Sequence, residues 1–146
     1  MILVTGATGS NGTELLKLLS ARGVPARAMV RSTDKAGAVA KLPGVEIVAG
    51  DFDDDASLDR ALHGVERAFL LTNSTDRAEA RQMSFVAATK RGGVRHILKL
   101  SQFAADEASA IYGVIGLVAG SFAAQALASL AGALIRRRNR KEQLAK

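Results

Sequence analysis

The first hundred residues alternate short apolar runs with longer stretches in which apolar positions recur at helical spacing. The apolar runs are typical of strands buried on both faces, and they lie at residues 2–4, 26–30, 45–48, 67–71 and 96–100. The stretches between them predict helices at residues 10–22, 34–41, 57–62 and 77–91, the second of which is weak. Strands that alternate with helices indicate βαβ units, so we expect an α/β fold with a doubly wound parallel sheet of about five strands.

A different pattern begins near residue 108. Residues 110–135 contain no charged side chain, and this stretch is longer than the roughly 20 residues that a helix needs to cross a bilayer. The sequence leaves two interpretations open, packing on the domain or within a homo-oligomer, and contact with a membrane as an anchor. We therefore predict a folded domain at residues 1–107, an apolar helical segment at 108–135 and a basic tail at 136–146.

The net charge of +6 is concentrated at the C-terminal end of the sequence. Residues 136–146 hold six basic residues and one acidic residue, a net of +5, which leaves +1 for residues 1–135. Aromatic content is 4% and Trp is absent, which argues against a stacking surface for single-stranded nucleic acid. We expect no specific nucleic-acid binding, because a terminal run of charge is usually solvated.

Two further features restrict the class of protein. The sequence has no Cys, which excludes disulfides and thiolate metal sites. Neither a basic stretch nor a long apolar segment precedes Gly6, so we expect a mature N-terminus and a cytoplasmic protein, with membrane anchoring as the alternative.

A glycine-rich motif, TGATGSNG at residues 5–12, joins the first predicted strand to the first predicted helix. Gly6 permits a sharp turn, Gly9 leaves room for a pyrophosphate, and Gly12 permits close packing of the helix. The helix N-terminus then offers free N–H groups and a positive dipole end to phosphates. In this context the motif predicts a Rossmann-like dinucleotide site; the alternative is that the glycines serve only the turn.

The residues after the second predicted strand discriminate between cofactors. NAD-binding units usually place a carboxylate there, about 20 residues after the glycine motif, to bind the ribose 2′-hydroxyl. This sequence has Arg31 instead, followed by Ser32 and then by Lys35. A guanidinium forms charge-assisted hydrogen bonds to a 2′-phosphate, so NADP(H) is favoured over NAD(H); the alternative is that Arg31 is only a solvated loop residue.

Polar residues also follow the third and fourth predicted strands. Asp51 is placed to accept the adenine amino group and Phe52 to cover the ring. We expect the acidic residues 53–55 to solvate the loop and favour the next helix N-terminus rather than hold a metal ion. Thr72-Asn73-Ser74 would line the ribose and nicotinamide side, because ligands in such folds bind outside the carboxyl ends of the strands.

Four segments, VTGATGSNG, AMVRSTDK, VAGDFDD and VRHILKLS, together resemble the NmrA-like group of atypical short-chain dehydrogenase/reductases over residues 1–107. That group includes NADPH-dependent quinone and azo-compound reductases and non-catalytic NADP sensors that regulate transcription. The resemblance implies that Arg31 and Lys35 bind the 2′-phosphate, Asp51 and Phe52 the adenine, and Thr72 the nicotinamide side. It also places the phosphates at Gly6, Thr8, Gly9, Ser10, Asn11 and Gly12.

Catalytic residues are harder to identify. Ser101 ends the fifth predicted strand, where related dehydrogenases place a hydrogen-bonding Ser, and it is a weak candidate. The single Tyr, Tyr112, is followed four residues later by Gly116, and no Lys occurs between Lys99 and Lys141, so a Tyr–Lys proton-donating pair is missing. The sequence predicts hydride transfer from NADPH to a quinone-like or carbonyl acceptor. The alternatives are a non-catalytic NADP(H)-sensing protein and a truncated family member without activity.

Overall fold

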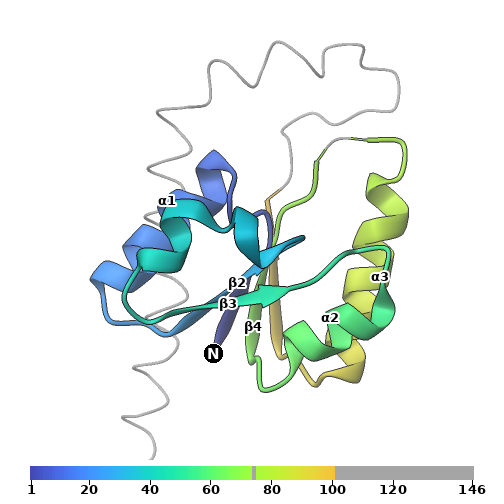
Figure 1. Cartoon of the computed structure of the whole chain (residues 1–146). Helices are drawn as coiled ribbons and strands as arrows, with labels where there is room; N and C mark the ends of the chain where they lie inside the picture. The colour runs from blue at the N-terminus through green and yellow to red at the C-terminus, as the bar shows by residue number, and fades with distance from the viewer. Residues whose placement is uncertain (74, 101–146) are drawn as a thin grey trace, which may run out of the picture. The chain divides into compact units, whose positions relative to one another are not determined.

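The computed structural model describes residues 1–73 and 75–100, which contain a five-stranded parallel sheet. The strand order is β3-β2-β1-β4-β5 (Figure 1), with β1 at Ile2–Val4, β2 at Ala26–Val30, β3 at Val45–Ala49, β4 at Arg67–Leu70 and β5 at His96–Lys99. The chain begins in the middle of the sheet, proceeds outward through β2 and β3, and then returns to the other side of β1 for β4 and β5. The direction of winding therefore changes between β1 and β4, the place where ligands bind in doubly wound sheets.

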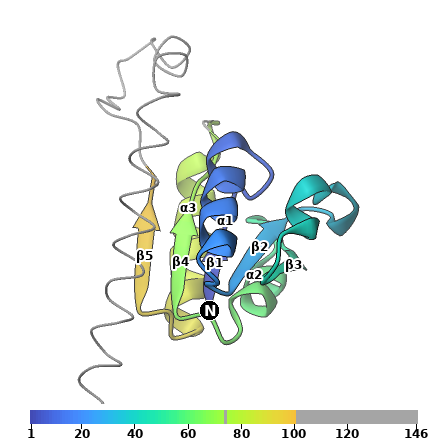
Figure 2. The same ribbon diagram turned by 90° about the vertical axis from the view of Figure 1, so that its left-hand side faces the viewer.

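Helices cover both faces of the sheet (Figure 2). One face is covered by α1 (Ser10–Ala21), and the other by α2 (Asp55–Leu62) and α3 (Ala78–Arg91). This arrangement confirms the predicted doubly wound α/β fold. It also explains the continuous apolar run of β1, because a central strand needs apolar side chains toward both helical layers.

The apolar core follows from these two layers. Leu15, Leu16 and Leu19 give α1 a fully buried stripe against the sheet. On the opposite face, a buried cluster joins the sheet to α2 and α3, and it consists of Leu3, Met29, Leu58, Ala61, Leu62, Val65, Ala68, Leu70, Phe85 and Ala88. The core therefore fixes α2 and α3 against the strands whose carboxyl ends carry the predicted site.

Two predicted helices differ from the structure. Residues 34–41 form two short 3₁₀ turns, η1 (Thr33–Lys35) and η2 (Gly37–Lys41), in place of one weak helix. Gly37 has a φ of +55°, a left-handed conformation that a continuous right-handed helix excludes. The helix predicted at 57–62 begins at Asp55, because the Asp54 side chain caps it. The other predicted elements agree with the structure to within one residue.

The predicted apolar segment at 108–135 and the basic tail at 136–146 lie outside the described residues, as does the boundary at residue 107. Within residues 1–73 and 75–100, no helix has both the length and the apolar character that a bilayer span requires.

Candidate functional site

The predicted site segments follow four neighbouring strands. They are residues 5–12 after β1, 31–35 after β2, 50–54 after β3 and 71–77 after β4. Because the strands are parallel, all four segments leave the sheet at its carboxyl edge. The structure thus brings the predicted phosphate, 2′-phosphate, adenine and nicotinamide residues to one edge of the sheet.

The three motif glycines of the turn after β1 have different surroundings. Gly6 has a φ of +60°, which L side chains rarely adopt. A Cβ at Gly12 would lie 2.8 Å from the Ala7 Cα and closer still to the Gly6 carbonyl oxygen, so the turn itself excludes a side chain there. A Cβ at Gly9 would meet only the Gly6 carbonyl oxygen, at an ordinary contact distance of 3.4 Å. The protein therefore requires glycine at two of these positions, and the space at Gly9 is open to a ligand.

The N-terminus of α1 is suited to an anion. Gly9 is the N-cap residue and supplies no capping side chain, and the first turn has no acidic residue. The first N–H groups of a helix have no partner inside the helix, and they lie at its positive dipole end. Thr8, Gly9 and Ser10 are exposed, so solvent and solutes can reach these groups. This geometry matches the known pattern of phosphate binding at helix N-termini.

Thr5 is a structural residue of the site that the sequence reasoning missed. It is fully buried, and its Oγ1 donates to the Leu71 carbonyl oxygen at 3.0 Å and accepts from the Leu71 N–H at 2.8 Å. These bonds join the start of the glycine turn to the loop after β4. The sequence does contain a signal for this role of Thr5, a hydroxyl residue directly after a buried apolar strand, because a buried hydroxyl needs a hydrogen-bond partner.

Arg31 and Lys35 supply positive charge after β2, the strand that pairs with β1. Both are exposed, and neither forms an ion pair with another described residue. Arg31 directly follows β2, which pairs with β1, whereas Lys35 lies in η1. Both side chains are therefore available to a phosphate at this edge of the sheet.

The loop after β3 is fixed by its own hydrogen bonds. The Asp51 N–H donates to the Ser57 Oγ at 2.9 Å, and the Asp53 N–H donates to the Asp51 Oδ1 at 3.0 Å. Sequence reasoning missed Ser57, although a Ser in the first turn of a helix commonly bonds to the preceding loop. The ring of Phe52 packs edge-on against Phe85 of α3, with 5.7 Å between ring centroids and 65° between planes. Phe52 thus contacts the core, and its cover of an adenine ring stays a prediction.

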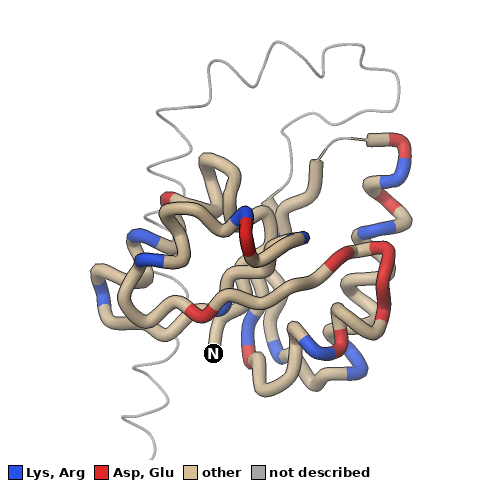
Figure 3. The backbone as a smooth tube through the Cα atoms, in the orientation of Figure 1, with Lys and Arg blue, Asp and Glu red and all other residues tan. Residues whose placement is uncertain are grey.

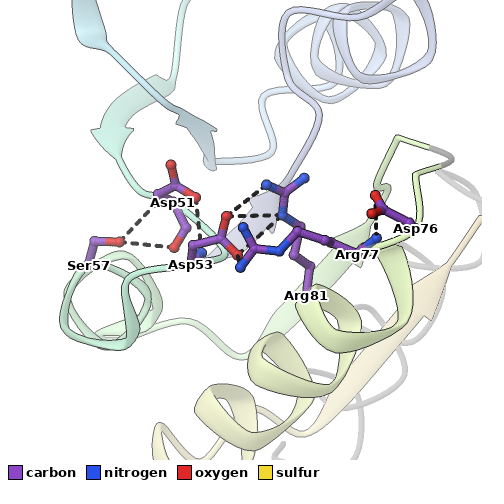
Figure 4. Close-up of polar contacts among 6 residues, drawn as sticks. All are labelled: Asp51, Asp53, Ser57, Asp76, Arg77 and Arg81. Carbon is purple, nitrogen blue, oxygen red and sulfur yellow. Dashed lines mark hydrogen bonds and ion pairs between the residues drawn. The ribbon is translucent and has the colours of Figure 1, made fainter.

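The acidic residues 53–55 lie directly before and at the start of α2 (Figure 3), and they have two roles. Asp54 caps α2, where its Oδ1 accepts from the Ser57 N–H at 3.2 Å, and Asp55 lies in the first turn, as expected. Asp53 has a further role that the sequence does not predict, because its carboxylate pairs with Arg81 at 2.7 Å and with Arg77 at 3.1 Å (Figure 4). The hydrogen bond from Arg81, assisted by the charge of Arg77, lowers the pKa of Asp53 against the opposing effect of burial.

The loop after β4 is also held by α3. The Oγ1 of Thr72 accepts a hydrogen bond from the Gln82 Nε2 at 2.8 Å. Ser74 and the weak catalytic candidate Ser101 lie outside the described residues.

Comparisons with known proteins agree with this geometry. The family model described as NmrA-like family matches residues 1–113. A (4-alkanoyl-5-oxo-2,5-dihydrofuran-3-yl)methyl phosphate reductase of Streptomyces griseus is 44% identical over 110 residues, which are 75% of this chain and 37% of that protein.

Two solved structures with bound cofactor are similar over most of the chain. The NADPH-dependent quinone oxidoreductase of Escherichia coli, complexed with NADPH, has a TM-score of 0.67 and 29% identity. The triphenylmethane reductase of Citrobacter sp., complexed with NADP(H), has a TM-score of 0.64 and 27% identity. Each similarity covers 90% of this chain and 46% of the other, so this chain spans less than half the length of these proteins.

Proposed function

The chain belongs to the NmrA-like family, and on that premise we propose that it binds NADP(H) at the carboxyl edge of the sheet and reduces a quinone-like or carbonyl acceptor. The observation that carries the proposal is the open position at Gly9, in a turn whose Gly6 and Gly12 are required by the fold itself. Relatives solved with NADPH and NADP(H) support it. When bound, the cofactor would supply the hydride.

The phosphate-binding part of the proposal rests on backbone groups and two cations. The turn and the first turn of α1 would hold the pyrophosphate through Gly6, Thr8, Gly9, Ser10, Asn11 and Gly12. Arg31 and Lys35 would hold the 2′-phosphate, because both are exposed and form no ion pair with another described residue. A guanidinium and an ammonium favour a dianionic phosphate over a ribose hydroxyl, which is the basis for preferring NADP(H) to NAD(H).

The remaining site residues orient the two ends of the cofactor. Asp51 would accept the adenine amino group, Phe52 would cover the ring, and Thr72 would lie on the nicotinamide side. Ser101 remains the candidate for a hydrogen bond to the acceptor.

A second candidate function is a non-catalytic NADP(H)-binding protein that acts through partner contacts. The sequence favours it in one respect, because Tyr112 is followed four residues later by Gly116 and no Lys lies between Lys99 and Lys141. A reductase without a Tyr–Lys pair needs another proton donor or an acceptor that takes its protons from water.

Acceptor-dependent oxidation of NADPH separates the two candidates. The full chain is mixed with NADPH and a soluble quinone, an azo dye or an aldehyde, and the loss of NADPH absorbance is followed. Oxidation that requires both the protein and an acceptor supports the reductase. Saturable NADPH binding without oxidation by any acceptor class would instead favour the regulatory function.

A further inference from the structure

Three side chains in the first two turns of α3 each contact a loop at the carboxyl edge of the sheet. Arg81 pairs with Asp53 in the loop after β3, and Phe85 packs on the preceding residue, Phe52. Gln82, the neighbour of Arg81, donates to Thr72 in the loop after β4. One short stretch of helix thus holds both loops that carry the proposed adenine and nicotinamide contacts.

Arg81 contacts the Asp53 carboxylate through two of its guanidinium nitrogens, Nε and Nη2 (Figure 4). The Arg81 Nε lies 3.2 Å from the Asp53 Oδ2, and the Nη2 lies 2.7 Å from the same oxygen. The Nε also lies 3.3 Å from Oδ1, to which Arg77 adds a contact at 3.1 Å. The side chains of Arg81 and Asp53 are 30% and 33% exposed, so water screens this pair less than a fully exposed one.

The pair is connected to the proposed adenine residue. The Asp53 N–H donates to the Asp51 Oδ1, so the position of Asp53 determines where one carboxylate oxygen of Asp51 is held. Arg81 itself is carried by α3, which is fixed to the domain because its Phe85 and Ala88 are fully buried in the core. Arg81 therefore links the core of the domain to the Asp51 carboxylate through Asp53.

We propose that Arg81 is a positioning residue for the adenine side of the cofactor site, acting through Asp53 on Asp51. The inference rests on the proposed binding of NADP(H). A loop held in its binding conformation before the ligand arrives does not have to be ordered during binding, and this raises affinity. Gln82 holds the loop after β4 in a similar way, through its hydrogen bond to the Thr72 Oγ1.

The test is a double-mutant cycle in the full chain. Asp53→Asn, Arg81→Gln and the double variant are titrated with NADPH and with adenosine 2′,5′-bisphosphate, which carries only the adenine side. A matched control exists on the same helix, where Arg91 pairs with Asp59 of α2 at 2.9 Å and also lies 4.0 Å from Asp55. Asp59→Asn and Arg91→Gln break an ion pair between α3 and α2 and leave the pair between α3 and the loop after β3 intact, and thermal unfolding is measured for every variant.

We expect each single substitution at Asp53 or Arg81 to weaken both ligands by about two- to fivefold, the range typical of a partly exposed ion pair. The double variant should lose no more than either single variant, because both substitutions break the same link. Asp59→Asn and Arg91→Gln should bind both ligands as the wild type does, at a similar loss of thermal stability.

Three results would overturn the inference. Unchanged affinity in Asp53→Asn and Arg81→Gln, with normal NADPH binding by the wild type, removes the positioning role and leaves the proposed function intact. Additive losses in the double variant would show that Asp53 and Arg81 act on the ligand separately. Failure of the wild-type chain to bind either ligand would overturn the proposed function, and the positioning role with it.

Discussion

Glycine stands at three motif positions of the turn after β1, and the structure gives a different reason for each. Gly6 adopts a positive φ, and Gly12 lies against backbone atoms of the same turn. Neither condition applies to Gly9, whose N-cap conformation, with φ −78° and ψ 168°, is open to any residue. The alternative that the motif serves only the turn explains Gly6 and Gly12 but gives no reason for Gly9.

Substitution by Ala should therefore separate folding from binding. Gly12→Ala should lower the free energy of unfolding by about 1–3 kcal/mol, because its methyl group meets backbone that cannot move aside, and this outweighs the better helix propensity of Ala. Gly9→Ala should change stability by less than about 0.5 kcal/mol, yet weaken NADPH binding about tenfold or more. Denaturant unfolding and fluorescence titration measure the two quantities. Normal NADPH binding by Gly9→Ala would contradict the pyrophosphate assignment.

The choice of cofactor should depend on Arg31. Arg31→Asp removes a donor to the 2′-phosphate and introduces an acceptor for a 2′-hydroxyl, so the ratio of NADPH to NADH affinity should fall about tenfold or more. Arg95→Asp makes the same change of charge before β5, at the opposite edge of the sheet, and should leave the ratio unchanged. An unaltered ratio in Arg31→Asp would exclude the proposed role of Arg31.

Among the elements, α2 depends on a cap that also shapes the site loop. Asp54→Ala removes the acceptor of the Ser57 N–H and should lower the free energy of unfolding by about 1 kcal/mol. Asp54→Asn retains a capping oxygen and should keep most of that stability. Denaturant unfolding compares the two variants, and equal losses would mean that the charge of Asp54, rather than its cap, stabilises the helix.

Element boundaries could be predicted where the local signal is strong. The run Ile2-Leu3-Val4 and the leucines of α1 gave correct positions because burial on both faces, or along one stripe, requires such patterns. The predicted start of α2 is two residues late, because the sequence does not show which of the acidic residues 53–55 is the cap, and the structure identifies Asp54. The contact of Asp53 with Arg81 could not be predicted, because the two residues lie far apart in sequence and meet only when α3 packs beside α2.

At the scale of the whole molecule, the sheet topology determines which segments meet at the carboxyl edge of the sheet. The change of winding between β1 and β4 places the glycine turn, Arg31, Lys35 and the Asp51 loop at one edge, the location expected for a dinucleotide. The chain covers 37% of its Streptomyces relative and 46% of the two cofactor-bound structures. The proposed cofactor site is therefore the part of the proposed function that experiments on the described residues can test most directly.

The proposed dinucleotide site is tested by a titration of the full chain with NADPH and with NADH, followed by nicotinamide fluorescence. We expect saturable binding of both reduced cofactors, with higher affinity for NADPH because Arg31 and Lys35 would bind its extra phosphate. Equal affinities would contradict the assignment of those two residues. No binding of either cofactor at millimolar concentration would contradict the proposal that this edge of the sheet is a dinucleotide site.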